Sequence, residues 1–438
     1  MMNGKNKDKE IRMKKGMRKA SLAVASLAVS AGILPVAAAA LHAPVKGVLE
    51  EGAKVMVAET LASTVEGDTI MDKNEPTLFA DSVVGPTISA TPVDKTVNML
   101  EGAIYQTTSS YRKCKSEEFM DDPRWGTDWY APVPVQMAWE AEEGAQYYTV
   151  QIATNRDFTD AAKYVTFDTQ MILNDLFMGK KYYYQIIVTY ADKTVKSRIF
   201  EFETAYLPRT IYLEGVSNTR DAGGYKTTDK KHRVRQGMVY RGGMLEGITP
   251  AAKEKALKTF GIKTDLDLRA EATASPLGNT VNFINVSGPY YGGASTTGTG
   301  IGSLADSSRG PWKGTYRDAL VTEIRAFANP DNYPIYVHCS LGRDRTGTLI
   351  FLINALCGVG EMDLFMDYEI SFFSVKGCAD NQTPSNMVGN NFGSMYNYLK
   401  NYKPGITSMK QQVEQFMLDI GITQDEIDSI RNILVEDL

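Results

Sequence analysis

Residues 335–348 read IYVHCSLGRDRTGT, and this stretch decides how we expect the second half of the chain to fold. Residues 335–337 are apolar, which is typical of a buried strand, and they run directly into Cys339. A loop containing Gly342 follows, and residues 346–357 are apolar enough to form a buried helix. The sequence therefore predicts a strand, a tight loop and a helix in succession.

Such a loop makes an anion cradle, because successive backbone N–H groups and the helix N-terminus converge on one point. The same field stabilises a thiolate, so we expect the pKa of Cys339 to lie below its usual value. Arg345 can hold two oxygens of a phosphoryl group bidentately, with a permanent charge and a planarity that lysine lacks. The pattern predicts that Cys339 is a nucleophile and that Arg345 binds the group under attack.

The chemistry that follows is phosphoryl transfer through a thiophosphate intermediate, which water then hydrolyses, and it needs no metal or cofactor. Thr346 is placed to donate its hydroxyl to the thiolate, and His338 is expected to orient the loop through hydrogen bonds. The predicted substrate-binding residues are Ser340, Leu341, Gly342, Arg343 and Thr346.

The pattern His338-Cys339-x5-Arg345-Thr346 resembles the signature of the cysteine-dependent protein tyrosine phosphatase superfamily. It is most similar to bacterial tyrosine phosphatases whose loop reads His-Cys-x-x-Gly-Lys-Asp-Arg-Thr-Gly, with Arg343 in place of the lysine. Supporting motifs lie at residues 218–225, 234–243 and 261–271, so the resemblance spans residues 209–438. It implies an α/β phosphatase domain, with a central sheet flanked by helices and a strand-loop-helix phosphate cradle.

The general acid that protonates the leaving group has two candidates, since an aspartate is the usual donor in this superfamily. Asp344 lies in the loop beside Arg345, and in the resembling subfamily that aspartate is the suspected acid and base. Asp306 lies 33 residues before Cys339, at a spacing common among other members of the superfamily. It belongs to the Gly- and Ser-rich residues 288–310, which we expect to form a lid.

Further polar residues lie at the predicted strand ends. Asp267 and Arg269 end a strand, where α/β sheets place groups that face ligands. We expect them to shape the site, to pair with each other or to contact substrate. Arg220 and Asp221 are expected to form a salt bridge with each other beside the turn at residues 223–224.

Local signals define the other elements of this half. Thr249 and Pro250 are typical of a helix start, and Gly261 of its end. Residues 262–268 alternate as a strand does, and a helix is expected over residues 316–329. Thr423 and Glu426 form the sequence pattern of a capping box before a last helix. Alternating strands and helices predict an α/β domain.

The middle of the chain has a different pattern. From residue 133, short alternating runs rich in aromatic and β-branched residues predict an all-β sandwich domain. Residues 125–206 resemble a fibronectin type III domain through Trp139, Leu176 and Tyr182, with Met178 where that family usually has proline. Residues 44–124 are expected to be partly irregular, with strand potential at residues 93–105.

The N-terminus has the pattern of a secretory signal peptide over residues 1–43, with a basic run, an apolar Ala-rich stretch and small residues. We therefore expect a secreted or cell-surface protein. Four cysteines are too few for a disulfide scaffold. Cys357 is expected to be buried, and the sequence leaves open whether Cys114 pairs with Cys378.

Charge restricts the partners. The formal net charge is −5, and the basic residues 1–19 carry +6, so the remainder is strongly acidic. Nonspecific binding to nucleic acid is thereby disfavoured. Expected substrates are phosphorylated proteins, with phosphotyrosine favoured, or small phosphoesters. The alternatives are a phytase-like inositol-polyphosphate or phosphoinositide phosphatase, and a non-enzymatic phospho-ligand-binding or adhesion module in which the sandwich binds a protein or glycan.

Overall fold

A computed structural model describes residues 56–57, 88–100, 102–127, 129, 131–269, 272–286, 314–378 and 382–438. The predicted signal peptide, the predicted lid at residues 288–310 and Asp306 lie outside the described residues. Among the described residues, no helix is both long enough and apolar enough to cross a bilayer.

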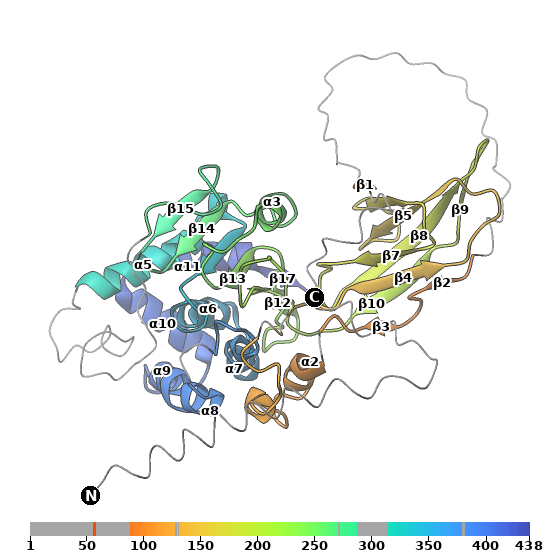
Figure 1. Cartoon of the computed structure of the whole chain (residues 1–438). Coiled ribbons are helices and arrows are strands. Elements are labelled where there is room, and N and C mark those ends of the chain that lie inside the picture. The colour runs from red at the N-terminus through yellow and green to blue at the C-terminus, as the bar shows by residue number, and fades with distance from the viewer. Residues whose placement is uncertain are drawn as a thin grey trace, which may run out of the picture. The chain divides into compact units, whose positions relative to one another are not determined.

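A five-stranded sheet with β16 at its centre organises the C-terminal half (Figure 1). Its strands pair in parallel except for β11, which runs antiparallel to β13. All four residues of β16 are buried, as expected of a central parallel strand that is covered on both faces. In sheet order the strands are β11 Arg220–Asp221, β13 Val239–Gly242, β16 Ile335–His338, β14 Thr264–Asp267 and β15 Asn282–Asn285.

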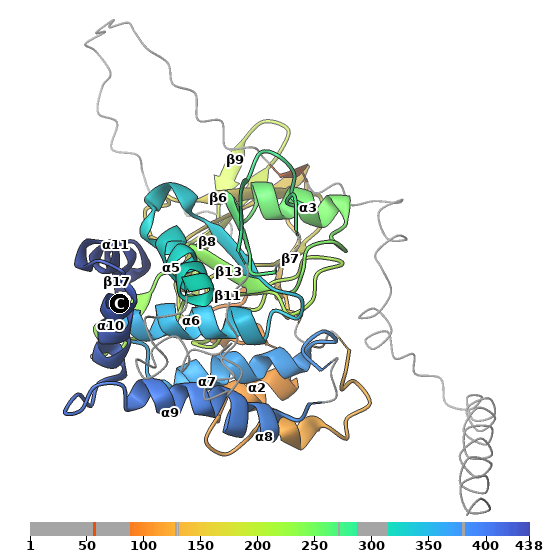
Figure 2. The same cartoon turned by 90° about the vertical axis from the view of Figure 1, so that its left-hand side faces the viewer.

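Helices cover both faces of this sheet. Alternate side chains of a strand point to opposite faces, so Tyr336 joins the core beneath α3 while Ile335 and Val337 join the larger core beneath α5, α6, α10 and α11. Figure 2 shows α6 and α7 running side by side on this larger side. The helices are α3 Pro250–Lys258, α5 Gly314–Ala328, α6 Asp344–Cys357, α7 Glu361–Glu369, α8 Pro384–Asn386, α9 Gly393–Lys400, α10 Met409–Ile420 and α11 Gln424–Leu434.

The predicted local signals are confirmed here. Thr249 caps α3 with Pro250 in its first turn, and Thr423 and Glu426 form the capping box of α11. Cys357 is buried, and no disulfide joins Cys114 to Cys378. The smaller elements are the helical turns η3 Pro330–Asn332, η4 Ile370–Phe373 and η5 Met387–Phe392, and the strands β12 His232–Val234 and β17 Val435–Asp437, which pair with each other.

Two sheets around a separate apolar core form the all-β part of the chain. One sheet has the order β1-β6-β5-β8-β10-β3, with β9 paired to β8, and the other has the order β2-β4-β7. The strands are β1 Met56–Val57, β2 Ala90–Thr91, β3 Thr96–Val97, β4 Val135–Trp139, β5 Tyr147–Ala153, β6 Ala162–Thr166, β7 Gln170–Leu173, β8 Lys181–Thr189, β9 Thr194–Lys196 and β10 Phe200–Thr204.

The sequence predicts that the sandwich begins at residue 125, but in the structure it begins earlier in the chain. Ile88 packs in the same core as Trp139, and β2 pairs with β4. The strand expected at residues 93–105 is limited to β3, since α2 Gly102–Ser109 follows it. Alternation of apolar residues therefore located β4, β5, β8 and β10, but it did not identify β6, β7 or the two-residue strands at the beginning of the sandwich.

The segment between β3 and β4 leaves the sandwich and packs on the α/β domain. It contains α2 and the helical turn η1 Ser116–Phe119. Ile104 and Trp129 share a core with Phe373 of η4, and Ser116 donates both its N–H and its hydroxyl to Glu369 at 2.7 and 2.8 Å. The insertion between β3 and β4 of the sandwich thus packs as part of the α/β domain.

The corner before β8 contacts the α/β domain directly. The backbone N–H of Met178 donates to the Gln236 amide oxygen at 2.9 Å, and the Gln236 amide nitrogen donates to the Met178 carbonyl at 2.8 Å. Lys255 of α3 forms an ion pair with Asp175 of the same corner at 2.7 Å. Because Met178 and Gln236 are both buried, neither backbone group can turn to water instead.

We expect Gln236→Ala to lower the free energy of unfolding by about 1–3 kcal/mol, because it leaves two buried backbone groups of Met178 without partners. Scanning calorimetry of the full chain measures the change. Gln411→Ala, at an exposed position of α10, is the control and should cost nothing measurable. Equal melting of the two variants would show that this contact does not stabilise the protein.

Candidate active site

The loop from Cys339 to Arg343 joins β16 to α6, as the sequence predicts. Gly342 lies at φ +69°, and a Cβ there would come within 2.2 Å of the Gly242 carbonyl oxygen. Only glycine fits this combination of backbone angle and close approach. The loop is therefore pressed against the end of β13, and its shape is fixed by that contact.

The thiol of Cys339 lies at the base of this loop and is 3% exposed. Burial acts to raise its pKa, but hydrogen bonding from the Thr346 hydroxyl and backbone N–H and the charge of Arg345 outweigh it. The pKa of Cys339 therefore lies below its ordinary value, in the direction that favours the thiolate. Thr346 and Arg345 both come from the first turn of α6, where the helix dipole acts the same way.

The half-buried Arg345 is held from the neighbouring strand, because its Nη1 donates to the Leu268 carbonyl at 2.9 Å. Glu323 of α5, 1% exposed, interacts electrostatically with Arg345. Burial raises the pKa of Glu323 well above its usual value, and the Arg345 charge opposes this rise. Glu323 is not among the residues predicted from the sequence, although a glutamate among Leu320, Ile324 and Phe327 on the apolar side of a helix is a detectable signal.

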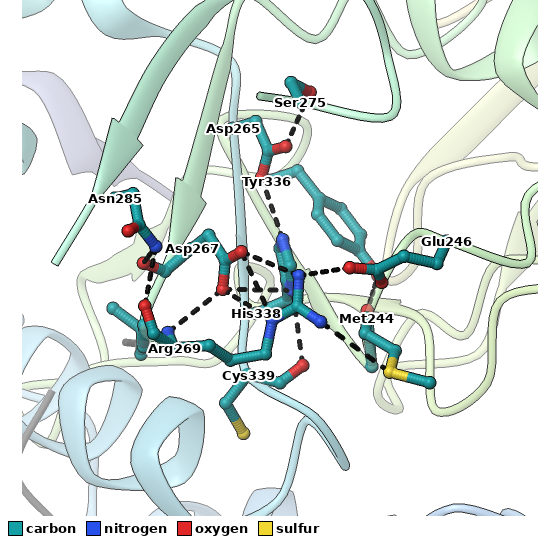
Figure 3. A network of polar contacts seen from close by, with 12 residues as sticks. Met244, Glu246, Asp265, Asp267, Arg269, Ser275, Asn285, Tyr336, His338 and Cys339 are labelled. Carbon is teal, nitrogen blue, oxygen red and sulfur yellow. Dashed lines mark hydrogen bonds and ion pairs between the residues drawn. The ribbon is translucent and has the colours of Figure 1, made fainter. Parts of the chain in front are cut away.

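His338 holds the other end of the loop (Figure 3). Its Nε2 lies 3.0 Å from Asp265, and its Nδ1 lies 3.2 Å from the Cys339 carbonyl oxygen. Both nitrogens therefore face acceptors, which favours the doubly protonated ring. Burial alone would lower the pKa of His338, but Asp265 and Asp267 raise it. The Cys339 sulfur points away from the ring in Figure 3, so His338 contacts the nucleophile through the backbone.

Asp267 and Arg269 pair with each other, which is one of the arrangements expected from the sequence. Arg269 donates from Nε and Nη2 to the two carboxylate oxygens of Asp267 at 2.9 and 2.8 Å. Glu246 accepts a further bond from Arg269, and the Asn285 amide donates to the carbonyls of both Asp267 and Arg269. The single positive charge of Arg269 is thus paired with two carboxylates, and most of its guanidinium is already engaged.

Arg343 and Asp344 also bind each other. The Nε of Arg343 donates to Asp344 at 2.7 Å, and its Nη1 donates to the Gly377 carbonyl, while Tyr368 donates to Asp344 at 3.3 Å. Arg343, which the sequence predicts to bind substrate, is fully buried. Its contact with substrate and the acid role of Asp344 both stay predictions.

A buried cluster beneath the loop holds its carbonyl groups. Asp367 of α7 accepts from both Arg220 and Arg241, and Arg241 donates to the Gly342 carbonyl at 2.8 Å. Arg220 also donates to Asn218, whose amide donates to the Leu341 carbonyl at 3.0 Å. In a trans peptide the N–H points opposite to the C=O, so the N–H groups of Gly342 and Arg343 point away from Asn218 and Arg241.

The expected salt bridge between Arg220 and Asp221 is wrong. Neighbouring residues of a strand point to opposite faces, so Arg220 faces Asp367 while Asp221 binds Arg209 at 2.9 Å. Asp221 also accepts from the N–H groups of Gly223 and Gly237. Ser340 and Leu341 are half-buried at the loop, and the Ser340 carbonyl accepts from the Met244 N–H.

Comparison with known proteins identifies a family for this part of the chain. Residues 211–436, more than half of the chain, match the tyrosine phosphatase family. A probable tyrosine-protein phosphatase of Dictyostelium discoideum is 32% identical over 63 residues, covering 14% of this chain and 38% of the relative. A putative tyrosine-protein phosphatase of Cupriavidus necator is 28% identical over 173 residues, covering 36% of this chain and 61% of the relative.

Among solved structures, the core catalytic domain of the PP-IP phosphatase SIW14 from S. cerevisiae is similar at 16% identity and a TM-score of 0.23. The match covers 37% of this chain and 86% of that domain. The matches to the Dictyostelium discoideum and Cupriavidus necator proteins each span less than two thirds of the length of those relatives.

We expect Arg345→Met to raise the pKa of Cys339, because it removes a charge that favours the thiolate. The ultraviolet absorbance of the thiolate, followed against pH with Cys339→Ser as the blank, measures it. Arg317→Met removes an arginine of α5 that pairs with Asp318 and should leave the titration unchanged. An unchanged titration in Arg345→Met would rule out Arg345 as a determinant of the thiol pKa.

We expect Asp367→Asn to lower the free energy of unfolding by about 3–5 kcal/mol, because two buried arginines lose their counter-charge. Denaturant unfolding measures it, and Asp425→Asn, in the exposed first turn of α11, should cost at most about 1 kcal/mol.

The sign of the pH dependence follows from the pKa of Asp367, which its arginine partners hold below the usual value although burial opposes them. Its contribution is present above about pH 4 and is lost as the pH falls further towards the folded-state pKa. The gap between wild type and Asp367→Asn should therefore narrow below that pH. A gap that widened in acid would contradict the assignment.

Proposed function

Because this chain belongs to the tyrosine phosphatase family, we propose that it hydrolyses phosphomonoesters, with phosphotyrosine favoured, through a thiophosphate intermediate on Cys339. The observation that carries the proposal is the position of Cys339 at the start of the loop between β16 and α6, where Thr346 and Arg345 of the first turn of α6 act to lower its pKa. A buried cysteine with an inert role has its pKa raised, as burial does for Cys357, to about 12.

The proposed reaction has two displacements. The Cys339 thiolate attacks phosphorus in line, an S–P bond forms, and the P–O bond to the leaving group breaks. Water then attacks phosphorus, the S–P bond breaks, and inorganic phosphate and the thiolate are released. Arg345 and the loop N–H groups bind the equatorial oxygens, whose charge they stabilise most strongly in the transition state.

Asp344 is the proposed proton donor to the leaving group and the acceptor of the proton of water in the second step. Arg343 and Tyr368 fix its carboxyl beside the loop, which supports a positioned acid-base group. Asp306, outside the described residues, is the other candidate. Substitution of each aspartate distinguishes the two candidates. Loss of the true acid slows the hydrolysis of aryl esters with good leaving groups less than the hydrolysis of alkyl esters.

The balance of charge around the loop supports a phosphotyrosine over an inositol polyphosphate. Among the described residues, Arg269 binds Asp267 and Glu246, and Arg343 binds Asp344. A substrate with several phosphates needs a surplus of positive charge around the nucleophile, whereas one phosphate monoester needs Arg345 and the loop amides alone. Phytase-like activity is therefore the second candidate.

We further propose that the protein is exported and acts outside the cytoplasm, on the basis of the signal-peptide pattern at residues 1–43. The all-β part is proposed to be a fibronectin type III-like module, since Tyr182 accepts a hydrogen bond from the Phe177 N–H at the corner that the resemblance places there. Its proposed role is to hold a protein or glycan partner near the catalytic loop.

We expect residues 44–438 to release phosphate from a phosphotyrosine peptide in the presence of EDTA, and Cys339→Ser to abolish turnover. Phosphoserine peptide, phosphoinositide and inositol hexakisphosphate assayed in parallel identify the preferred class. Ser429→Ala, on α11 and outside the loop, is the control and should keep the rate. If wild type and Cys339→Ser are equally inactive on every substrate but bind phosphopeptide, the protein is a recognition module.

A further inference from the structure

A cavity of about 410 Å³ lies apart from the catalytic loop. Its walls come from four parts of the chain: α2 of the insertion, the linker that follows β10, the turn that follows β11, and α7. None of residues 339–345 lines it. The residues on which the argument rests are Tyr105, Tyr206, Gly224, Tyr225, Asp363 and Met366.

The carboxylate of Asp363 has no hydrogen bond or ion pair with any other described side chain. It stands in the first turn of α7. The other acidic residue of that turn, Glu361, binds Tyr396 and Lys400, so the two carboxylates differ in their surroundings. Burial raises the pKa of Asp363 to about 6. An ionised Asp363 therefore lowers the stability of the folded protein at neutral pH, and no cationic side chain among the described residues pairs with it to offset this cost.

Three tyrosines line the same cavity, and their hydroxyl groups are partly committed elsewhere. Tyr225 donates to Asp367, and the Tyr206 hydroxyl accepts the N–H of Lys226. The Tyr206 ring already binds one cation, because the Lys226 ammonium lies 4.6 Å from its centroid. Tyrosine rings attract cations by their faces, and a carboxylate pairs with the same cations.

The chemistry of the lining selects the ligand. One carboxylate is too few ligands for calcium or magnesium, which take six or more oxygens. The volume lies within the range of cavities that hold small organic molecules. We propose that this cavity binds an organic cation, an alkylammonium or guanidinium group that pairs with Asp363 while its carbon chain packs against the tyrosines.

Two sources present that group: a free amine, and a lysine or arginine side chain of a peptide. The probes are therefore butylammonium and butylguanidinium as free cations, and N-acetyl-lysinamide and N-acetyl-argininamide as side-chain mimics. Pentanol, of similar length and without charge, is the control ligand. Calorimetric titration into the full chain at neutral pH measures each affinity.

We expect the cations to bind wild type, and Asp363→Asn to bind them at least tenfold more weakly. Glu361→Gln, the neighbouring carboxylate that already has partners, should bind as wild type does. Tyr105→Leu, at an exposed position of α2, should weaken binding without removing the charge. Tighter binding of the amides than of the free cations would identify a peptide side chain as the natural ligand, and the reverse order would identify a free amine.

Melting temperature separates a lost site from a lost fold. Asp363→Asn removes a charge that costs stability, so at neutral pH it should melt at or above the wild-type temperature. Saturating butylguanidinium should raise the melting temperature of wild type and not that of Asp363→Asn. Equal binding by Asp363→Asn, equal binding of pentanol, or no binding of any cation to wild type would overturn the proposal.

Discussion

The buried carboxylate of Asp367 is the group on which the catalytic loop depends. It pairs with Arg220 and Arg241, and these two arginines orient the carbonyls of Leu341 and Gly342, directly or through Asn218. Each of these two peptides presents its N–H on the side opposite to the carbonyl that is held. The orientation of the two N–H groups that we propose to bind the phosphoryl group is thus set by a side chain on α7.

A second buried network holds the opposite side of the loop. His338, Asp265 and Asp267 fix the start of the loop, and the Leu268 carbonyl fixes Arg345 after it. Buried ion pairs contribute little net stability, because desolvation offsets their attraction. We infer that both networks serve to position the loop and Arg345, since each network ends on a backbone group of the loop or on Arg345.

Local signals were enough to predict the elements around the site. The apolar residues of β16, the glycine of the loop and the caps of α3 and α11 act within a few residues, so sequence reveals them. The partners of Arg220 and Asp221 were not predictable in this way, because Asp367 is 147 residues from Arg220. Strand alternation nevertheless excludes a bond between the side chains of Arg220 and Asp221, because it places them on opposite faces of the sheet. Glu323 could have been predicted, since it lies among Leu320, Ile324 and Phe327 on the apolar side of α5 and is itself buried.

In the sandwich, a departure from the family's sequence pattern has a physical explanation. Where the fibronectin type III pattern has proline, this chain has Met178, whose N–H donates to Gln236 of the α/β domain. Proline has no N–H and would leave the Gln236 amide oxygen without this partner. The same corner carries Asp175, which pairs with Lys255 of α3. A module that served only as a flexible spacer would need neither contact, so the composition of this corner favours a sandwich docked on the domain that carries Cys339.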